Sequence, residues 1–380
     1  MQLFAPKELD EKESRAAVVP ATVKKLTDLG LDVSIESGLG AQSDHPDSQY
    51  EEAGAKVVTD RASALAQADI VVRVNKPPQN EVGALKDGAL HISFLDPFNE
   101  GDLMNSLASA SVNAISLEMV PRTTLAQKMD AISSQANLAG YASVIIAANR
   151  LTKIFPMMMT PAGTVSPAKV FVVGIGVAGL QAIATAKRLG ARVTAFDIRP
   201  EALEQAESLG AKALRIDLGE TGGTDQGYAK QLTDEQLEKQ RQEQAKECAK
   251  SDVVITTAKV FGRKSPILIK QDVVDMMLPG SVIVDLAAES GGNVEGTVLG
   301  QEVTTPNGVT IIGTGNFEGT VGQHASQVFA SNIANMIEHF WDKEEKTFKY
   351  DLEDEIMKGC LLSYEGKVVH ERFKEGSGDS

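Results

Sequence analysis

Three closely spaced glycines and an acidic residue downstream form the most specific chemical signal in the 380-residue sequence. Gly174, Gly176 and Gly179 follow a short apolar, largely β-branched run at residues 170–173, and Asp197 lies about 20 residues further on. The first glycine permits a sharp turn, the second lets backbone approach a pyrophosphate, and the third lets a helix pack on a strand. Phosphate then meets the positive end of that helix. The spacing predicts a dinucleotide-binding strand, turn and helix.

The acidic residue predicts which dinucleotide binds. A carboxylate at Asp197 accepts hydrogen bonds from a ribose 2′-hydroxyl and repels a 2′-phosphate, which favours NAD(H) over NADP(H). Arg199, two residues later, weakens this preference slightly. The alternative for the glycines is a helix packing site that tolerates glycine. The preceding strand, the following helix and the distance to Asp197 together favour dinucleotide binding.

A second polar group precedes a long uncharged segment at residues 131–149. Arg122, Gln127, Asp130 and Ser133 lie within 12 residues and could form a fixed hydrogen-bonding cluster, although Asp130 taken alone is expected to cap a helix. The segment approaches membrane-spanning length, but its serines, asparagines and glutamine make it too polar to cross hydrocarbon. We therefore expect a buried helix.

Other candidates stand on predicted loops. Arg15, Lys76 and Asp96 follow strand candidates and could take part in chemistry, although solvated loop charge is the favoured interpretation for each alone. Lys259 and residues 287–289 follow later strands, whose carboxyl ends should face a dinucleotide. Tyr228, in a segment rich in glycine and threonine, is predicted to be a lid residue, with an ordinary surface tyrosine as the alternative. The methionines at 157–159 are expected to fill the core.

Composition limits the class of protein. The length suits two domains, and 42% hydrophobic residues can fill their cores. The net charge of −15 argues against nucleic acid and against adsorption to anionic lipid, and could equally serve solubility. Cys248 and Cys360 show no paired spacing, so neither a disulfide framework nor a metal site is expected. The sequence lacks the pattern of a signal peptide, and a reducing cytoplasm is expected.

Strand and helix candidates alternate through residues 1–120 and again after residue 169. Alternation of this kind predicts an α/β fold with mostly parallel sheets. The first region has no phosphate-binding pattern of its own. A helix at residues 319–341 is expected to return to this region, and residues 356–369 are expected to form a hairpin.

Three segments resemble a known family. Residues 133–141, residues 156–165 and the glycine motif with its helix to Gly190 are similar to the soluble NAD(H)-binding alpha subunit of proton-translocating NAD(P)+ transhydrogenase, in its split form without membrane helices. The resemblance implies two Rossmann-like domains, at residues 1–130 with 320–380 and at residues 131–319, with the cofactor in the cleft between them. It also implies a homodimer.

The resemblance further implies which residues bind the cofactor. Nicotinamide contacts would come from Arg122, Thr123, Thr124, Gln127, Asp130 and Ser133. The pyrophosphate turn would comprise Gly174, Gly176, Val177 and Gly179, and the adenosine ribose would contact Asp197, Ile198 and Arg199. A mobile loop and the neighbouring helix would add Gly227, Tyr228 and Gln240, and Lys259 would flank the adenine or ribose.

The activity implied is direct hydride transfer between NADH and NADP+ held by a partner beta subunit, with a membrane-spanning subunit moving protons. The chain would then lie on the cytoplasmic face of the inner membrane through its partners. Hydride transfer between two nicotinamides needs no acid or base, so Arg122, Gln127 and Asp130 would act by aiming the ring.

The alternative function is an amino-acid dehydrogenase like alanine dehydrogenase, which belongs to the same superfamily and shares Arg15, Lys76 and residues 280–285. That reaction needs a general base. Asp96 stands where that family has a histidine, and Glu289 where it has an aspartate, so we expect no activity with alanine or pyruvate. A non-enzymatic NAD(H) sensor is a third class, which would need a reader domain.

Overall fold

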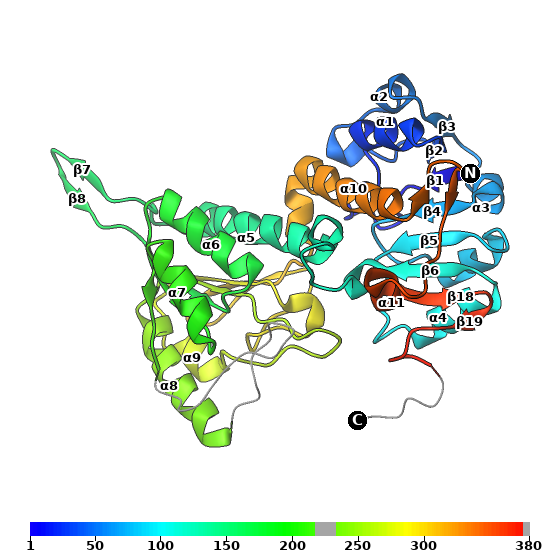
Figure 1. The fold of residues 1–380 in the computed structure, drawn as a ribbon. Helices are drawn as coiled ribbons and strands as arrows, with labels where there is room; N and C mark the ends of the chain where they lie inside the picture. Colours follow the sequence, from blue (N-terminus) through cyan, green and yellow to red (C-terminus); the bar gives the residue numbers. More distant parts are fainter. Residues whose placement is uncertain (217–232, 375–380) are drawn as a thin grey trace. The chain divides into compact units, whose positions relative to one another are not determined.

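The computed structural model describes residues 1–216 and 233–374. The chain divides into two compact units, which Figure 1 shows in the colours of the sequence. Unit 1 comprises Met1–Gln135 and Gly319–Ser380, and unit 2 comprises Ala136–Glu318. Unit 1 is therefore built from both ends of the chain.

Unit 1 contains a mostly parallel sheet, which has eight strands within the described residues, in the order β19-β18-β6-β5-β4-β1-β2-β3. Its parallel strands are β1 (Gln2–Ala5), β2 (Asp32–Glu36), β3 (Lys56–Val58), β4 (Ile70–Val72), β5 (Leu90–Ser93) and β6 (Asn113–Ser116). The tail adds the antiparallel hairpin β18 (Leu361–Tyr364) and β19 (Lys367–Val368). The hairpin expected at residues 356–369 is thus shorter, because Ile356–Cys360 lies within the helix α11 (Glu355–Cys360).

The helices of unit 1 are α1 (Pro20–Asp28), α2 (Asp47–Glu52), α3 (Arg61–Gln67), α4 (Gly101–Ser109), α10 (Gly322–His339) and α11. Short 3-10 turns lie at η1 (Ala41–Ser43), η2 (Gln79–Ala84), η3 (Leu117–Met119), η4 (Gln127–Met129) and η6 (Glu318–Val321). Helix α10 buries Ala325, Phe329, Ile333 and Met336, which recur every three or four residues and form one apolar face. The small antiparallel pair β16 (Trp341–Asp342) and β17 (Thr347–Phe348) follows it.

Unit 2 contains a sheet in the order β11-β10-β9-β12-β13-β15-β14. Its strands are β9 (Lys169–Val173), β10 (Arg192–Phe196), β11 (Lys212–Ala213), β12 (Val253–Thr256), β13 (Val282–Asp285), β14 (Glu302–Thr304) and β15 (Thr310–Ile312). All pairs are parallel except β14 with β15. Strand β9 lies between β10 and β12, and the direction of strand order reverses there, which is where open α/β sheets bind ligands.

The helices of unit 2 are α6 (Val177–Arg188), α7 (Pro200–Ser208), α8 (Asp234–Ala249) and α9 (Gln271–Asp275), with the 3-10 turn η5 (Ala288–Ser290). The uncharged segment forms α5 (Ala131–Arg150), but it is not buried on all sides, because Tyr141 and Ile145 are 40% and 38% exposed. Among the described residues, no helix is both long and apolar enough to span a membrane.

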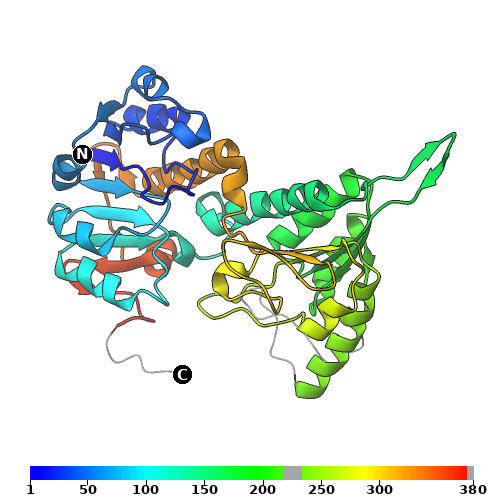
Figure 2. The ribbon, with the colours of Figure 1, turned by 180° about the vertical axis from the view of Figure 1, so that it is seen from behind.

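A hairpin arm, β7 (Met158–Thr160) with β8 (Gly163–Val165), extends away from the sheet and helices of unit 2 (Figures 1 and 2). Every residue of both strands is exposed. Met157, Met158 and Met159 are 59%, 46% and 76% exposed, so the expectation that they fill the core is wrong. Hydrophobic composition alone did not reveal that these residues leave the body of the unit.

Candidate functional site

The glycine motif forms the predicted turn between β9 and α6. Gly174 has φ +92°, a conformation that favours glycine. A β-carbon at Gly179 would lie 2.0 Å from the carbonyl oxygen of Gly174, so only glycine lets the helix approach the strand here. A β-carbon at Gly176 would meet no heavy atom within 4 Å, which leaves open space beside the start of α6. This open space fits a pyrophosphate group at the positive end of the helix, beside Val177.

Asp197 follows β10, next to the glycine turn. Its carboxylate accepts a hydrogen bond from the Ile175 N–H at 2.8 Å and from the Arg199 Nε–H at 2.9 Å. Burial would raise the pKa of Asp197, but the hydrogen bonds from Arg199 and Ile175 hold that pKa below its ordinary value. The carboxylate therefore stays ionised at neutral pH. Ile198 lies between these two charged residues and is partly buried.

Other loops of unit 2 lie at the carboxyl ends of the strands. Thr257, after β12, donates from its hydroxyl to the Gly174 carbonyl at 2.9 Å. Lys259, two residues later, forms an ion pair with Glu289 at 3.1 Å, and Glu289 also accepts from the Asn316 N–H at 2.9 Å. These contacts join three loops beside the glycine turn.

Gln240 lies in α8 and is 5% exposed. Its Oε1 accepts no hydrogen bond from the residues that the structure describes. Gly227 and Tyr228, the predicted loop and lid residues, lie outside the described residues.

The nicotinamide candidates lie in unit 1, from the loop after η3 to the first turn of α5. Arg122, Thr124 and Gln127 are exposed, Thr123 is partly exposed, and the Thr123 carbonyl accepts from the Gln127 N–H at 3.1 Å. Asp130 accepts from the Ser133 N–H at 2.9 Å and from the Ser133 hydroxyl at 2.5 Å. Asp130 therefore caps the first turn of α5 and orients Ser133. The structure thus groups the ring candidates on unit 1 and the phosphate and ribose candidates on unit 2.

The three loop charges of unit 1 differ from one another. Arg15 is 6% exposed and pairs with Glu13 at 2.7 Å, so the expectation of a solvated charge is wrong for Arg15. Lys76 pairs with Glu100 at 2.5 Å and lies 3.5 Å from Asp96, and the side chains of Lys76 and Asp96 are 40% and 45% exposed. Among the described residues, no group of three or more histidine, cysteine or acidic side chains could hold a metal ion.

Gly140 is a structurally important position that the sequence did not indicate. A β-carbon there would lie 2.2 Å from the Ala178 carbonyl oxygen, so the backbone of α5 contacts the first turn of α6. A glycine inside an otherwise helix-forming segment is the signal that could have indicated this contact, because glycine destabilises a helix interior.

Residues 4–139 match the N-terminal domain of alanine dehydrogenase/PNT, and residues 143–371 match the C-terminal domain of the same family. An NAD(P) transhydrogenase subunit alpha chain of Rhodospirillum rubrum is 42% identical over 377 residues, which cover 97% of this chain and 98% of the relative. The structure of a transhydrogenase from Sinorhizobium meliloti has a TM-score of 0.85 at 41% identity, covering 98% and 99% of the two chains. A structure of L-alanine dehydrogenase has a TM-score of 0.81 at 27% identity, with 98% of both chains covered.

The two mostly parallel sheets and the glycine turn define a two-domain Rossmann-like protein, which confirms the predicted fold class. The chain belongs to the alanine dehydrogenase/PNT family, as a homologue of the alpha subunits of NAD(P) transhydrogenase. The resemblance recognised in the sequence is thereby confirmed.

Proposed function

We propose that this chain is the NAD(H)-binding subunit of a proton-translocating transhydrogenase. It would transfer hydride directly between NADH and NADP+ held by a partner subunit, and a membrane-spanning subunit would couple the reaction to proton movement. The observation that carries the proposal is the glycine turn with an ionised Asp197 beside it, which suits a dinucleotide whose ribose lacks a 2′-phosphate.

The residues of unit 2 would bind one end of the cofactor. Backbone at Gly176, Val177 and Gly179 would receive the pyrophosphate at the first turn of α6, where the N–H groups of a helix start are available. Asp197, Ile198 and Arg199 would contact the adenosine ribose, and Lys259 would flank it from the loop after β12. The remaining residues proposed to contact the cofactor are Gln240, Gly227 and Tyr228.

The loop of unit 1 would orient the ring. NADH supplies the hydride when bound, so the protein needs no proton donor or acceptor for the transfer. Arg122, Thr123, Thr124, Gln127, Asp130 and Ser133 would orient the nicotinamide and exclude water. Orientation of this kind contributes about 7–11 kcal/mol to lowering a barrier in favourable cases. The caps that Asp130 forms with Ser133 support a loop of defined conformation.

The contacts of the loop charges disfavour an amino-acid dehydrogenase. Such an enzyme needs a base beside the ring, and the position expected to carry histidine is Asp96, which pairs with Lys76. Arg15, one of the two cations that could bind a substrate carboxylate, is buried against Glu13.

The hairpin arm supports the proposal of a homodimer. It exposes Met158, Met159 and Val165, Met157 directly before it is also exposed, and apolar strands of this kind are seldom left uncovered in a soluble protein. A pocket of about 640 Å³ at the base of the arm, lined by Leu151, Ile154, Phe155 and Leu189 among others, offers a second apolar surface. A second copy of the chain could cover both surfaces by a two-fold arrangement.

The membrane would be reached only through partner subunits, on the cytoplasmic face of the inner membrane.

The test is to titrate the purified chain with NADH and NADPH, and then to mix it with the NADP(H)-binding and membrane subunits and follow reduction of an NAD+ analogue by NADPH. We expect NADH binding without NADPH binding, and turnover only in the mixture. Turnover of alanine or pyruvate by the chain alone would instead establish the amino-acid dehydrogenase.

A further inference from the structure

The backbone carbonyl of Lys128 joins the loop that carries Gln127 to α10. The carbonyl oxygen of Lys128, in η4, accepts a hydrogen bond from the Asn332 side-chain amide at 3.0 Å and another from the Asn335 amide at 2.9 Å. The two asparagines are three residues apart on α10 and therefore lie on one face of the helix. Both acceptor positions of this oxygen are thus occupied by α10.

The second polar atom of each amide is also bound. The Asn332 Oδ1 accepts from the Ser134 hydroxyl at 2.7 Å, and the Asn335 Oδ1 accepts from the Lys25 ammonium at 2.8 Å. Because an ammonium only donates and a backbone carbonyl only accepts, the orientation of the Asn335 amide is unambiguous. The same carbonyl fixes the orientation of Asn332.

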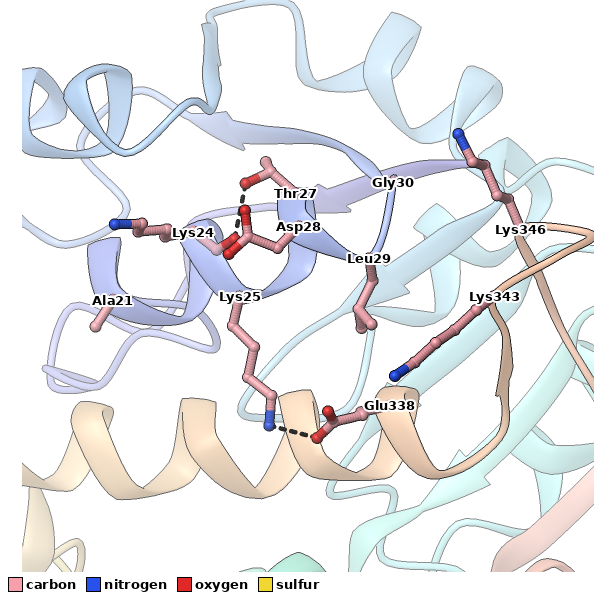
Figure 3. Close-up of a pocket in the computed structure, with 10 residues that line it drawn as sticks. All are labelled: Ala21, Lys24, Lys25, Thr27, Asp28, Leu29, Gly30, Glu338, Lys343 and Lys346. Carbon is pink, nitrogen blue, oxygen red and sulfur yellow. Dashed lines mark hydrogen bonds and ion pairs between the residues drawn. The ribbon is translucent and has the colours of Figure 1, made fainter.

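The environments of the two asparagines differ. Asn332 is 6% exposed and contacts the first turn of α5 through Ser134. Asn335 is partly exposed, and its partner Lys25 extends from α1 to form an ion pair with Glu338 of α10 at 2.7 Å. Figure 3 shows this ion pair at the edge of a pocket of about 790 Å³. The Lys128 carbonyl is therefore connected to both α1 and α5.

This arrangement restrains the residues beside Lys128. Lys128 lies between Gln127 and Met129, and the Met129 side chain is fully buried. The backbone from Gln127 to Asp130 therefore cannot shift without breaking the hydrogen bonds from Asn332 and Asn335 to the Lys128 carbonyl. The hydrogen bond from the buried Asn332 amide restricts the segment most strongly, because a fully satisfied buried polar group cannot be released without cost. The side chain of Gln127, by contrast, is exposed.

We propose that Asn332 and Asn335 are positioning residues for hydride transfer: they hold the Lys128 carbonyl and so set the direction of Gln127. The inference rests on the proposed function, in which this loop orients the nicotinamide. Since two amides share one acceptor, each can retain the loop when the other is removed. Replacement of both asparagines should therefore slow hydride transfer by more than the product of the two single effects.

The experiment compares Asn332→Ala, Asn335→Ala and the double variant, each mixed with the partner subunits. The matched control is Ser331→Ala, also on α10, whose hydroxyl donates to Gln327 of the same helix at 2.7 Å. We expect each single variant to slow hydride transfer less than about threefold and the double variant to slow it about tenfold to a hundredfold, while the Kd for NADH changes less than about threefold. Ser331→Ala should match the wild type.

Folding is checked by the near-ultraviolet circular dichroism of Trp341, which is 7% exposed and hydrogen-bonded to Leu29 at 2.9 Å. If the double variant does not fold, Asn332→Ala with Asn335→Asp replaces it, because this change at position 335 keeps an acceptor for the Lys25 ammonium but removes the N–H that donates to the Lys128 carbonyl. A rate equal to the wild type in the folded double or replacement variant overturns the inference. So does an equal loss of rate and NADH affinity.

Gln127→Ala separates this inference from the proposed function. If Gln127→Ala leaves transfer unchanged, the assigned role of the loop fails, whatever the asparagines do. If Gln127→Ala slows transfer and the double asparagine variant does not, the positioning role alone is wrong.

Discussion

The guanidinium of Arg199 donates to both carboxylate oxygens of Asp197, with Nε 2.9 Å from Oδ1 and Nη2 2.9 Å from Oδ2. The same Nη2 donates to the Ile175 carbonyl at 3.0 Å, and the Ile175 N–H donates back to Asp197 at 2.8 Å. The proposed ribose acceptor is therefore bound to a cation that could itself pair with a 2′-phosphate. Cofactor preference should depend on the pair rather than on Asp197 alone.

Asp197→Ala should release Arg199 and shift preference toward NADPH. We expect the ratio of NADPH to NADH affinity to rise about tenfold or more, because a charge-assisted hydrogen bond contributes roughly 1.5–3 kcal/mol. Fluorescence titration with the two reduced dinucleotides measures this ratio. The control is the double variant Asp197→Ala with Arg199→Ala, in which the ratio of NADPH to NADH affinity should not rise. An equal rise in both variants would show that Arg199 does not contribute to NADPH binding.

Gly140→Ala should destabilise unit 2 and weaken NADH binding. Alanine in a helix interior normally stabilises by about 0.5–1 kcal/mol relative to glycine. Here the new methyl group would meet the Ala178 carbonyl oxygen and push α5 from the first turn of α6, which we expect to cost about 1–3 kcal/mol. Thermal unfolding and NADH titration measure the two effects.

Gly101→Ala is the matched control for this change, because Gly101 lies in α4 and a β-carbon there meets nothing within 4 Å. It should leave stability unchanged or raise it. If Gly140→Ala behaved in the same way, the proposed close contact between α5 and α6 would be wrong.

Charges on the hairpin arm should dissociate the proposed dimer. Met157 directly precedes β7 and Met159 lies within it, and their side chains are 59% and 76% exposed. Replacement of both by glutamate places two like charges on the arm and beside it, and should convert a dimer into a monomer at micromolar concentration, measured by sedimentation velocity. Leu352→Glu, at a site 44% exposed on unit 1, should leave the dimer intact. A monomeric wild-type chain would refute the dimer itself.

Glu8→Gln should stabilise the protein only above mildly acidic pH. Burial raises the pKa of Glu8 from 4.5 to about 7, although its carboxylate accepts from the Val74 N–H at 2.7 Å. The folded state therefore retains a proton that the unfolded state releases near pH 4.5, and the resulting stability is lost as pH rises through about 7.

Glutamine keeps the acceptor without ionising, so we expect a gain of about 3 kcal/mol at pH 8 and none near pH 4. Urea unfolding across this pH range measures the difference, and the acidic end serves as the internal control. A difference that does not vary with pH would contradict the assignment to Glu8.

Several features of the site were predictable because they are local in the sequence. The strand before Gly174, the helix after Gly179 and the position of Asp197 each follow from the spacing of neighbouring residues. The capping role of Asp130 was likewise visible as an acidic residue before an uncharged helix.

Other predictions failed where burial depends on distant residues. The methionines of the arm were expected in the core, since hydrophobicity does not tell whether the covering surface comes from the same chain or another. Arg15 was expected in solvent, yet it packs against Glu13 and Gln135, the latter 120 residues away.

The sequence by itself determined the Rossmann-like turn, the acidic residue beside it and the α/β class, because short-range spacing dictates strand, turn and helix. Only the tertiary structure decided that Arg199 binds the Ile175 carbonyl 24 residues away and that Asn332 binds the Lys128 carbonyl 204 residues away. Such contacts depend on how the chain folds back on itself, and hydrogen bonds between distant residues leave no periodic pattern in the sequence.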